Sequence, residues 1–370
     1  MKIVYYTDQI YLHGGIERVL ANKLNFWVNE YGFETHIITT EQNGKPPCYE
    51  VDNKVLFHDL DIKYDRKRRY LDPVNFFKLP KHFFRLKRKL KEIDPDVVVV
   101  CNFAFDFYFI PFLHKRSKKI KEFHSSRYFD HLDRLNNRSL IKKIYYRLND
   151  YVERKYDHLV LLTIDEIPYY SSNNTVVIPN ALSNFPDRFS SLTTERAISA
   201  GRIAPVKGFE RLIESWVTVN KKYPDWKLDI YGHGEQSYIS KLQQLINGNQ
   251  LENKITLCGS TSNLEEEMVN SSLYIMTSLT ECFPMVLLES LAVGLPVVSF
   301  DCPNGPRNII SNNEDGILVT DGDVDEMAGV IIGIIDNKDL RKKMGKKART
   351  NIKRLLPQHV MKQWLTLFQE

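Results

Sequence analysis

The sequence lacks the features of a secreted or membrane-spanning protein. After Lys2 only a short apolar run follows, and it ends at Asp8, so we expect no signal peptide. The longest hydrophobic segment, 97–113, is interrupted by Asn102 and Asp106 and falls short of the roughly 18 apolar residues that cross a bilayer. We therefore expect a cytoplasmic protein, and its charge distribution leaves peripheral association with the inner face of the plasma membrane open.

Cysteine is scarce and metal-binding patterns are missing. The five cysteines are odd in number, and no two have CxxC spacing, which excludes a disulfide framework and a zinc site of that kind. Pairs of aspartates in a DxD pattern occur at 59–61, 321–323 and 323–325, but none directly follows a clean buried strand. The pair at 321–323 is typical of a turn that leads into a helix. We expect no metal in this protein.

The 370 residues are 43% hydrophobic and 26% charged, which is typical of a globular protein with two domains. Strand-like runs alternate with helical periodicity in both halves, so we expect an α/β fold with two doubly wound, Rossmann-like domains. A polar stretch without periodicity, 184–194, suggests a linker, which gives domains 1–183 and 184–356. Ligands of such sheets bind beyond the carboxyl ends of the strands, and two facing sheets would form a cleft.

Residues 280–291 (TECFPMVLLESL) carry the pattern of an anion site. Pro284 stands just before a helix, where the N–H groups of Met285 and Val286 are free to bind a phosphate. Glu289 lies about one turn further, at roughly 6 Å, and suits ribose hydroxyls, while Glu281 precedes the helix on the side of an attached sugar. The alternative is that both glutamates are ordinary helix-flanking acids.

Two cations stand at another strand end, in the run SAGRIAPVKGF that begins at Ser199. Arg202 can hold a diphosphate through two hydrogen bonds, and Lys207 adds a point charge. Together they can neutralise a departing nucleotide diphosphate without a metal. The alternative is a basic surface turn, which their position at a strand end disfavours.

Weaker signals come from glycines and one histidine. Gly14 and Gly15 lie at a strand-to-helix turn that favours an anion, although the GxGxxG fingerprint is absent. Gly232, in the run YGHGE, indicates a tight turn beside a nucleotide. His124 follows a strand, so we expect its ring to point into the cleft; the alternative is a structural histidine.

Charge is concentrated between residues 63 and 91, which hold twelve Lys and Arg against two Asp. Residues 76–93 have the pattern of a basic helix, and Phe76, Phe77, Phe83, Phe84 and Leu86 are interleaved with the charges. This region is either a set of solvated helix faces or a surface that meets an anionic membrane. Nucleic acid is a third reading, but no nucleic-acid motif accompanies the charge, so we expect none as a partner.

Taken together, these motifs resemble the retaining glycosyltransferases of family 4, which have the GT-B fold. The resemblance extends over nearly the whole chain, from GGIER at residue 14 through EFHSS at 122 and IPNAL at 178 to ECFPMVLLE at 281, AVGLPVVSFD at 292 and CPNGPRNII at 302. The CPNGP segment is similar to that of bacterial enzymes that build surface polysaccharides or lipid-linked oligosaccharides. The resemblance further implies that the final helix, 357–370, returns to pack on the first domain.

The resemblance implies a role for each matching residue. Arg202 and Lys207 would bind the donor diphosphate, Glu289 the ribose and Glu281 the transferred sugar. The implied remainder of the site is Gly15 facing the donor phosphate, His124 beside the sugar on the acceptor side, Gly232 by the nucleotide, and backbone N–H groups around Phe283, Pro284, Met285 and Val286. Where the family often has glycines, this chain has Cys282 and Pro284, which leaves the sugar undetermined.

We therefore predict a retaining hexosyltransferase with a nucleotide-diphosphate sugar as donor, UDP being the most frequent nucleotide in the family. The acceptor would be a glycan or a lipid-linked molecule, bound by the first domain, in bacterial polysaccharide or glycoconjugate synthesis. The nucleotide sugar is a co-substrate, and no cofactor is expected. The alternatives are another GT-B enzyme, such as a nucleotide-sugar epimerase or a sugar phosphorylase, and a non-catalytic nucleotide-sugar-binding protein.

Overall fold

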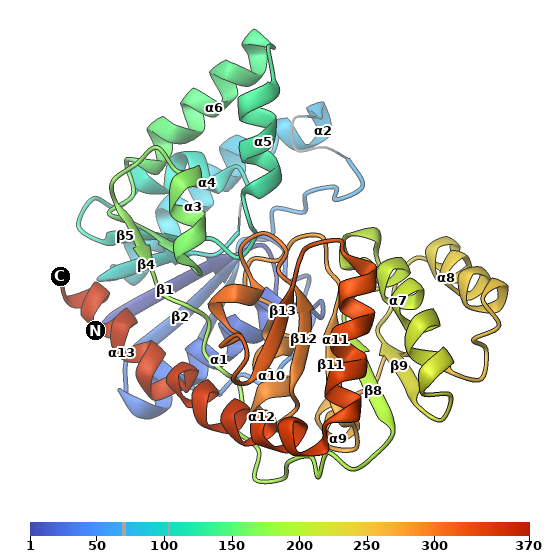
Figure 1. The fold of residues 1–370 in the computed structure, drawn as a ribbon. Coiled ribbons are helices and arrows are strands. Elements are labelled where there is room, and N and C mark those ends of the chain that lie inside the picture. Colours follow the sequence, from blue (N-terminus) through green and yellow to red (C-terminus); the bar gives the residue numbers. More distant parts are fainter. Residues whose placement is uncertain (69–71, 103) are drawn as a thin grey trace. The chain divides into compact units, whose positions relative to one another are not determined.

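The computed structural model describes residues 1–68, 72–102 and 104–370, which divide into two compact units. Unit 1 comprises Met1–Ala181 with Pro357–Glu370, and unit 2 comprises Leu182–Leu356. The division falls two residues before the boundary expected from the sequence. Each unit is an α/β layer structure with one parallel sheet (Figure 1).

The sheet of unit 1 has the strand order β3-β2-β1-β4-β5-β6-β7, and all its pairings are parallel. Its strands are β1 (Lys2–Thr7), β2 (Glu34–Thr39), β3 (Leu56–Asp59), β4 (Val97–Val100), β5 (Lys118–Glu122), β6 (His158–Leu161) and β7 (Thr175–Val177). Strand β4 consists of four valines that are all buried, as a central parallel strand covered on both faces requires.

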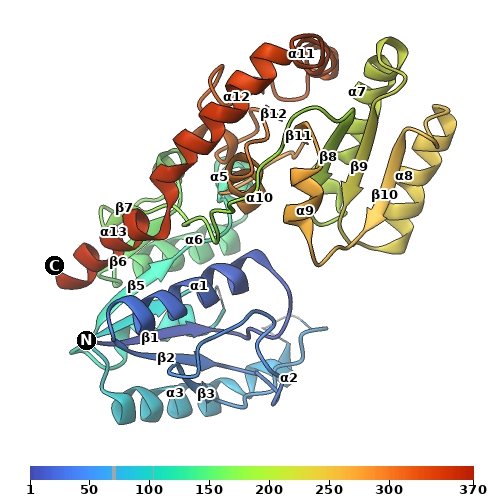
Figure 2. The same ribbon diagram turned by 90° about the horizontal axis from the view of Figure 1, so that it is seen from below.

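Helices cover both faces of this sheet, and Figure 2 shows α1 on one face and α3 on the other. The helices of unit 1 are α1 (Gly15–Glu30), α2 (Pro73–Phe76), α3 (Leu79–Ile93), α4 (Asp106–Phe109), α5 (Tyr128–Asn136), α6 (Leu140–Glu153) and α13 (Pro357–Gln369). Helix α13 lies beside α1, where the rings of Trp27 and Phe368 are 5.2 Å apart. The last helix therefore packs on the first unit.

The basic helix expected over 76–93 is two helices in the structure. Helix α2 ends at Phe76 and α3 begins at Leu79, where Pro80 occupies the first turn and needs no hydrogen-bond partner. Helix α3 turns Leu86, Leu90 and Ile93 into the core of unit 1. Leu86 is thus unavailable to a membrane, contrary to expectation.

The sheet of unit 2 has the order β10-β9-β8-β11-β12-β13, again with parallel pairings. Its strands are β8 (Arg196–Ala200), β9 (Lys227–Tyr231), β10 (Ile255–Gly259), β11 (Leu273–Met276), β12 (Val297–Phe300) and β13 (Gly316–Val319). Its helices are α7 (Phe209–Lys222), α8 (Gln236–Gly248), α9 (Leu264–Val269), α10 (Met285–Ala292), α11 (Val324–Asp336) and α12 (Lys338–Asn351).

The polar stretch 184–194 is part of unit 2 rather than a free linker. The Ser190 N–H donates to the Val293 carbonyl at 2.9 Å, and Leu192 is buried. The guanidinium of Arg349 stacks on the rings of Phe185 and Phe189. Aromatic anchors among polar residues thus fix a segment whose composition alone indicated a loop.

The DxD pairs of unit 2 have structural partners. Asp323 caps α11 by accepting a hydrogen bond from the Glu326 N–H at 2.8 Å, and Asp321 pairs with Arg211 at 2.9 Å.

Among the described residues, no helix is both long enough and apolar enough to cross a membrane.

Candidate functional site

The carboxyl edge of the unit 2 sheet carries an ion pair between two predicted site residues. Lys207 ends a 3₁₀ turn, Pro205–Lys207, that follows β8, and Glu281 follows β11. The Lys207 ammonium donates to Glu281 Oε1 at 2.5 Å, and the Ser278 hydroxyl donates to the same oxygen at 2.7 Å. The Lys207 side chain remains 24% exposed, so an incoming anion can reach its ammonium group.

Glycine lets the backbone segments of this edge approach closely. Gly208 has φ +60°, and a Cβ there would lie 2.2 Å from the Thr277 carbonyl oxygen, at the end of β11. Gly232 has φ +152°, and its Cβ would lie 1.8 Å from the Gly201 carbonyl oxygen. Any side chain at either position would push these strand ends apart.

Helix α10 begins at Met285, as the sequence predicted. Its first backbone hydrogen bond runs from the Leu287 N–H to the Pro284 carbonyl at 3.0 Å, so the N–H groups of Met285 and Val286 precede it. Phe283, like Pro284, is buried. The amino end of this helix is therefore a set of donors held by a rigid, buried turn.

The CPNGP segment holds the turn before α10, which the sequence analysis did not predict. Asn304 adopts φ +77° and pairs with Glu281 in a parallel bridge. A Cβ on Gly305 would lie 2.7 Å from the Glu281 Cβ and 2.8 Å from the Pro284 Cδ. Asparagine and glycine are the residue types that tolerate such a backbone, so their presence in this segment is the signal in the sequence that could have indicated the turn.

The other two predicted donor ligands lie at the same edge. Glu289 is half-buried in α10. Burial raises the pKa of the Tyr274 phenol, and the charges of Glu281 and Glu289 add to this effect, so both carboxylates lie near this tyrosine. Arg202 is exposed next to Gly201, and no ion pair joins it to any described residue. The structure thus pairs Lys207 with Glu281 and places Glu289 and the exposed Arg202 at the same strand edge.

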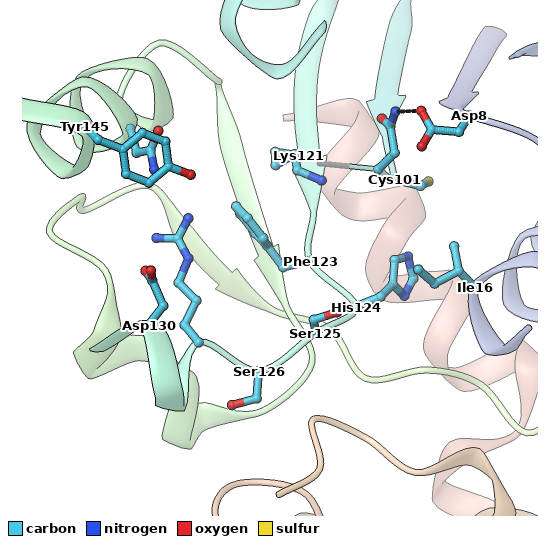
Figure 3. A pocket seen from close by; sticks show the side chains of 13 residues that line it. Asp8, Ile16, Cys101, Lys121, Phe123, His124, Ser125, Ser126, Asp130 and Tyr145 are labelled. Carbon is cyan, nitrogen blue, oxygen red and sulfur yellow. Dashed lines mark hydrogen bonds between the residues drawn. The ribbon is translucent and has the colours of Figure 1, made fainter. Parts of the chain in front are cut away.

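Unit 1 contains a cavity of about 390 Å³ at the carboxyl ends of β4 and β5 (Figure 3). The predicted residue His124 lines it, as does Ile16 in the first turn of α1. Gly15 starts that helix, and a Cβ there would meet open space. The start of α1 and the end of β5 therefore meet at one pocket.

One wall of this pocket alternates cations with an aromatic ring. Phe123 has the Lys121 ammonium 4.7 Å and the Arg127 guanidinium 4.8 Å from its ring centre. Burial lowers the pKa of Lys121 to about 8. Arg127 pairs with Glu153, and its Nη1, itself buried, has no hydrogen-bond partner among the described residues. Neither cation was predicted from the sequence, because Lys121 belongs to a run of lysines and Arg127 follows two serines, and neither pattern indicates a buried cation.

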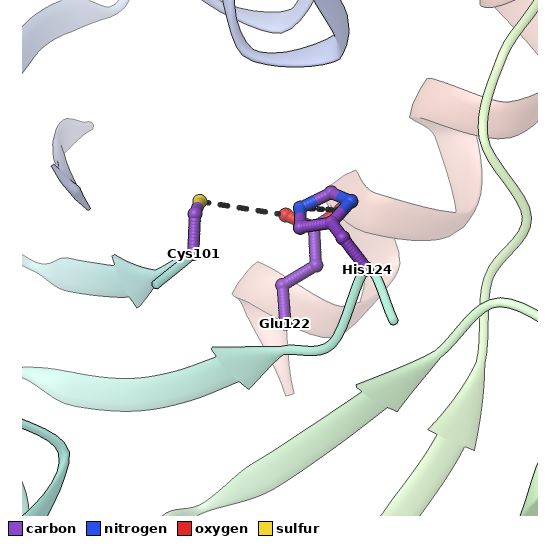
Figure 4. A group of neighbouring side chains, drawn as sticks. All are labelled: Cys101, Glu122 and His124. Atoms are coloured by element: carbon purple, nitrogen blue, oxygen red, sulfur yellow. Dashed lines mark hydrogen bonds and ion pairs between the residues drawn. The ribbon is translucent and has the colours of Figure 1, made fainter. Parts of the chain in front are cut away.

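His124 lies in a buried charge cluster as well as at the pocket wall (Figure 4). Its Nε2 is 3.5 Å from Glu122 Oε1, and the same carboxylate oxygen pairs with Lys23 from α1. Burial disfavours the Glu122 charge, but Lys23 and then His124 outweigh it and hold the pKa of Glu122 below its usual range. The imidazole is therefore oriented by Glu122.

This cluster is also where a metal ion could bind. Ligand atoms of Cys101, Glu122 and His124 all lie within 4.8 Å of one another. However, Lys23 already supplies the positive charge beside Glu122, and burial raises the pKa of the Cys101 thiol, which disfavours a thiolate ligand. A cation would have to displace the lysine, so the residues present fit an ion pair better than a metal.

Comparison with known proteins agrees with this architecture. The sequence model of the family described as "Glycosyl transferases group 1" matches residues 184–351. An uncharacterized glycosyltransferase of Haemophilus influenzae is 28% identical over 94% of both chains. The amylovoran biosynthesis glycosyltransferase AmsD of Erwinia amylovora is 26% identical over 98% of both chains.

Solved structures match the fold of the whole chain. A Staphylococcus aureus TarM mutant in complex with fondaparinux, α-GlcNAc-glycerol and UDP covers all of this chain with a TM-score of 0.78 and 17% identity. Anabaena HepE in complex with UDP-glucose also covers all of it, with a TM-score of 0.76 and 17% identity. The family model lies in unit 2 and the structural likeness extends over both units, so the whole chain has the GT-B fold and its second unit matches the glycosyl transferases group 1 domain.

Proposed function

We propose that this protein transfers a hexosyl or N-acetylhexosaminyl group from a UDP-sugar to a glycan or lipid-linked acceptor, with retention of configuration. The Lys207–Glu281 pair beside the amino end of α10 is the observation that carries the proposal. A partly exposed ammonium group and a set of backbone N–H donors thus lie at the carboxyl edge of the unit 2 sheet, and such groups bind a diphosphate.

In this proposal Lys207 exchanges its carboxylate partner for a phosphate oxygen when the donor binds. Glu281 is then released to accept hydrogen bonds from the transferred sugar, while Ser278 still holds it in place. Arg202 adds a second cation at the rim, and Glu289 binds the ribose. As the glycosidic bond breaks, charge develops on the leaving diphosphate, and Lys207 with the start of α10 stabilises it.

The acceptor in this proposal enters the pocket of unit 1. Its polar groups find an unsatisfied donor in Arg127 Nη1, and its sugar rings can stack on Tyr145, which lines the cavity and is 41% exposed. The acceptor hydroxyl attacks on the face that the diphosphate leaves, and a phosphate oxygen takes its proton. No step requires a metal ion, because the cations named here supply the positive charge.

The names of similar proteins favour UDP and a bacterial polysaccharide pathway. The TarM and HepE structures were solved with UDP or UDP-glucose, and AmsD is named for amylovoran biosynthesis. We place the protein in the cytoplasm, peripheral to the membrane. Within 63–91, Phe76, Phe77 and Phe84 remain exposed beside basic residues and can contact anionic lipid.

The test is a panel of UDP-, GDP- and ADP-sugars, scored first by thermal shift and then by release of free nucleotide with bacterial glycolipid extracts as acceptors. Stabilisation by one UDP-sugar of RT ln(1 + [L]/Kd), followed by an α-linked product from an α-linked donor in NMR spectra, supports the proposal. An inverted product rules out retention. An isomerised donor indicates an epimerase, and uptake of free phosphate indicates a phosphorylase.

A further inference from the structure

Helices α5 and α6 form a hairpin, residues 128–153, that extends away from the sheet of unit 1 (Figure 1). An apolar stripe runs along the solvent side of α6, with residues three and four apart on one helix face. Its members and exposed fractions are Leu140 (74%), Ile141 (80%), Ile144 (66%), Leu148 (48%) and Tyr151 (52%). On α5, Phe129 and Leu135 are also more than half exposed.

The opposite side of α6 is the side that packs on unit 1. Asn149, Val152 and Glu153 are buried there, and Asn149 accepts a hydrogen bond from the Tyr108 hydroxyl at 2.8 Å. These contacts fix the orientation of the helix, so the stripe is the face of α6 that is exposed to solvent. Exposed apolar surface of this extent, continuous along about three helical turns, marks a contact surface.

The charges around the stripe select the partner. Each acid of the hairpin already has a cation: Arg134 pairs with Asp130 and Asp150, Lys142 with Asp133, and Arg127 with Glu153. The cations without an ion pair among the described residues are Arg138, Lys143 and Arg147, all exposed. Lys143 and Arg147, four residues apart, form a row along one edge of the stripe.

We propose that the outer face of the α5–α6 hairpin docks on an anionic lipid surface. The stripe enters the boundary between headgroups and acyl chains, while Arg138, Lys143 and Arg147 meet lipid phosphates. A second copy of this chain fits less well, because a two-fold contact through this face would bring the same uncompensated cations against each other.

The hairpin connects this surface to the pocket of unit 1. Tyr145 and Asn149 from α6, with Asp130 from α5, line the cavity, and Figure 3 shows Tyr145 and Asp130 there. Docking therefore brings the pocket to the membrane, where a lipid-linked acceptor is held by its tail; this consequence rests on the function proposed above. The docking of the hairpin on a membrane does not depend on the transfer reaction.

Co-sedimentation of the full chain with vesicles tests the docking without any transfer reaction. Vesicles of phosphatidylglycerol and phosphatidylcholine are compared with vesicles of phosphatidylcholine alone. We expect the double substitution Ile144→Ser with Leu148→Ser to lower the partition coefficient on anionic vesicles at least about tenfold, because each side chain loses burial in the bilayer. Lys143→Gln with Arg147→Gln should lower it about fivefold per charge, and only on anionic vesicles.

Matched controls separate this surface from others. Leu56→Ser with Phe57→Ser removes two exposed apolar side chains from the edge strand β3, at 45% and 42% exposure, and should leave binding within twofold. Far-UV circular dichroism and the thermal shift with UDP check that every variant is folded. Unchanged vesicle binding in both hairpin variants overturns the proposal, and so does loss of binding only in Phe77→Ser with Phe84→Ser. A dimer in sedimentation velocity that Ile144→Ser with Leu148→Ser dissociates, without vesicle binding, assigns the stripe to self-association instead.

Discussion

At the scale of single residues, Lys207 is the most direct test of the donor site. Its ammonium is the group that can leave Glu281 for a phosphate oxygen. We expect Lys207→Ala to lower kcat/KM for transfer about 10²–10³-fold, by analogy with the loss of one oxyanion donor. Lys222→Ala is the matched control, because Lys222 also pairs with an acid of unit 2, Asp336, but on the surface. Equal activity in both variants would remove Lys207 from the mechanism.

Asp106 makes the stability of unit 1 depend on pH in a direction that can be predicted. Burial, with the nearby charge of Asp8, raises the pKa of Asp106 to about 8, so the folded protein keeps this carboxyl protonated at pH values where the unfolded chain has released the proton. The folded state then binds more protons than the unfolded state between about pH 4 and 8, and Asp106 makes stability fall as pH rises through that window.

Asparagine cannot bind or release a proton, so Asp106→Asn removes this pH dependence. The melting temperature of the variant minus that of the parent should therefore increase between pH 5 and 8. Differential scanning fluorimetry of both proteins across this range measures the gap. Other groups titrate equally in the two proteins, so their contributions cancel in the difference between the two melting temperatures. A gap that stays constant over the range contradicts the raised pKa.

Residue by residue, the sequence predicted the positions along the strand edge of unit 2 better than the environment of His124. Arg202, Lys207 and Glu281 follow strands, Glu289 lies about one turn into α10, and their local motifs indicated these positions. The orientation of His124 depends on Glu122 and Lys23, and Lys23 is 99 residues from Glu122 in the chain. No periodicity shows such a pairing, because it arises only when α1 packs on the sheet.

At the scale of elements, the strand ends of unit 2 depend on glycine. A Cβ at Gly208 would lie 2.2 Å from the Thr277 carbonyl oxygen, and φ there is +60°. We expect Gly208→Ala to lower the free energy of unfolding by about 1–3 kcal/mol and to weaken UDP binding.

Gly329→Ala is its control, because Gly329 lies exposed inside α11 and its added Cβ would meet nothing within 4 Å. Alanine there should stabilise unit 2 by about 0.5–1 kcal/mol. Urea unfolding and calorimetric titration with UDP measure both effects. If the two variants behave alike, the close approach at Gly208 does not hold the site together.

The elements that the sequence analysis left out are those that break the usual hydrophobic pattern. In α3, Leu86, Leu90 and Ile93 form a buried face with the usual helical spacing. In α6 the apolar residues face solvent, and Asn149 and Glu153 are on the packed side. A prediction that puts apolar residues in the core assigns the wrong face of such a helix to the core. Exposed apolar residues opposite buried polar ones indicate a contact surface.

At the scale of the whole molecule, the alternation of strands and helices was enough to predict two parallel sheets, because each βαβ unit is local. The return of the last helix was implied by the resemblance alone. The hydrophobic pattern could not indicate it, since the partners of α13 in α1, Lys23 and Trp27, lie more than 300 residues earlier in the chain. Trp364 is fully buried, and the Lys23 ammonium lies 4.0 Å from its ring.

Trp364→Ala should therefore destabilise unit 1, by about 3–5 kcal/mol, although it lies near the end of the chain. Hydrogen exchange should rise in peptides from β1 and β2 and stay unchanged in peptides from β11 and α10, because α13 belongs to unit 1. Trp216→Ala removes an equally buried tryptophan from unit 2 and should give the reverse pattern. If both substitutions raise exchange in both units alike, the chain unfolds as one cooperative body and the helix stabilises the whole rather than its own unit.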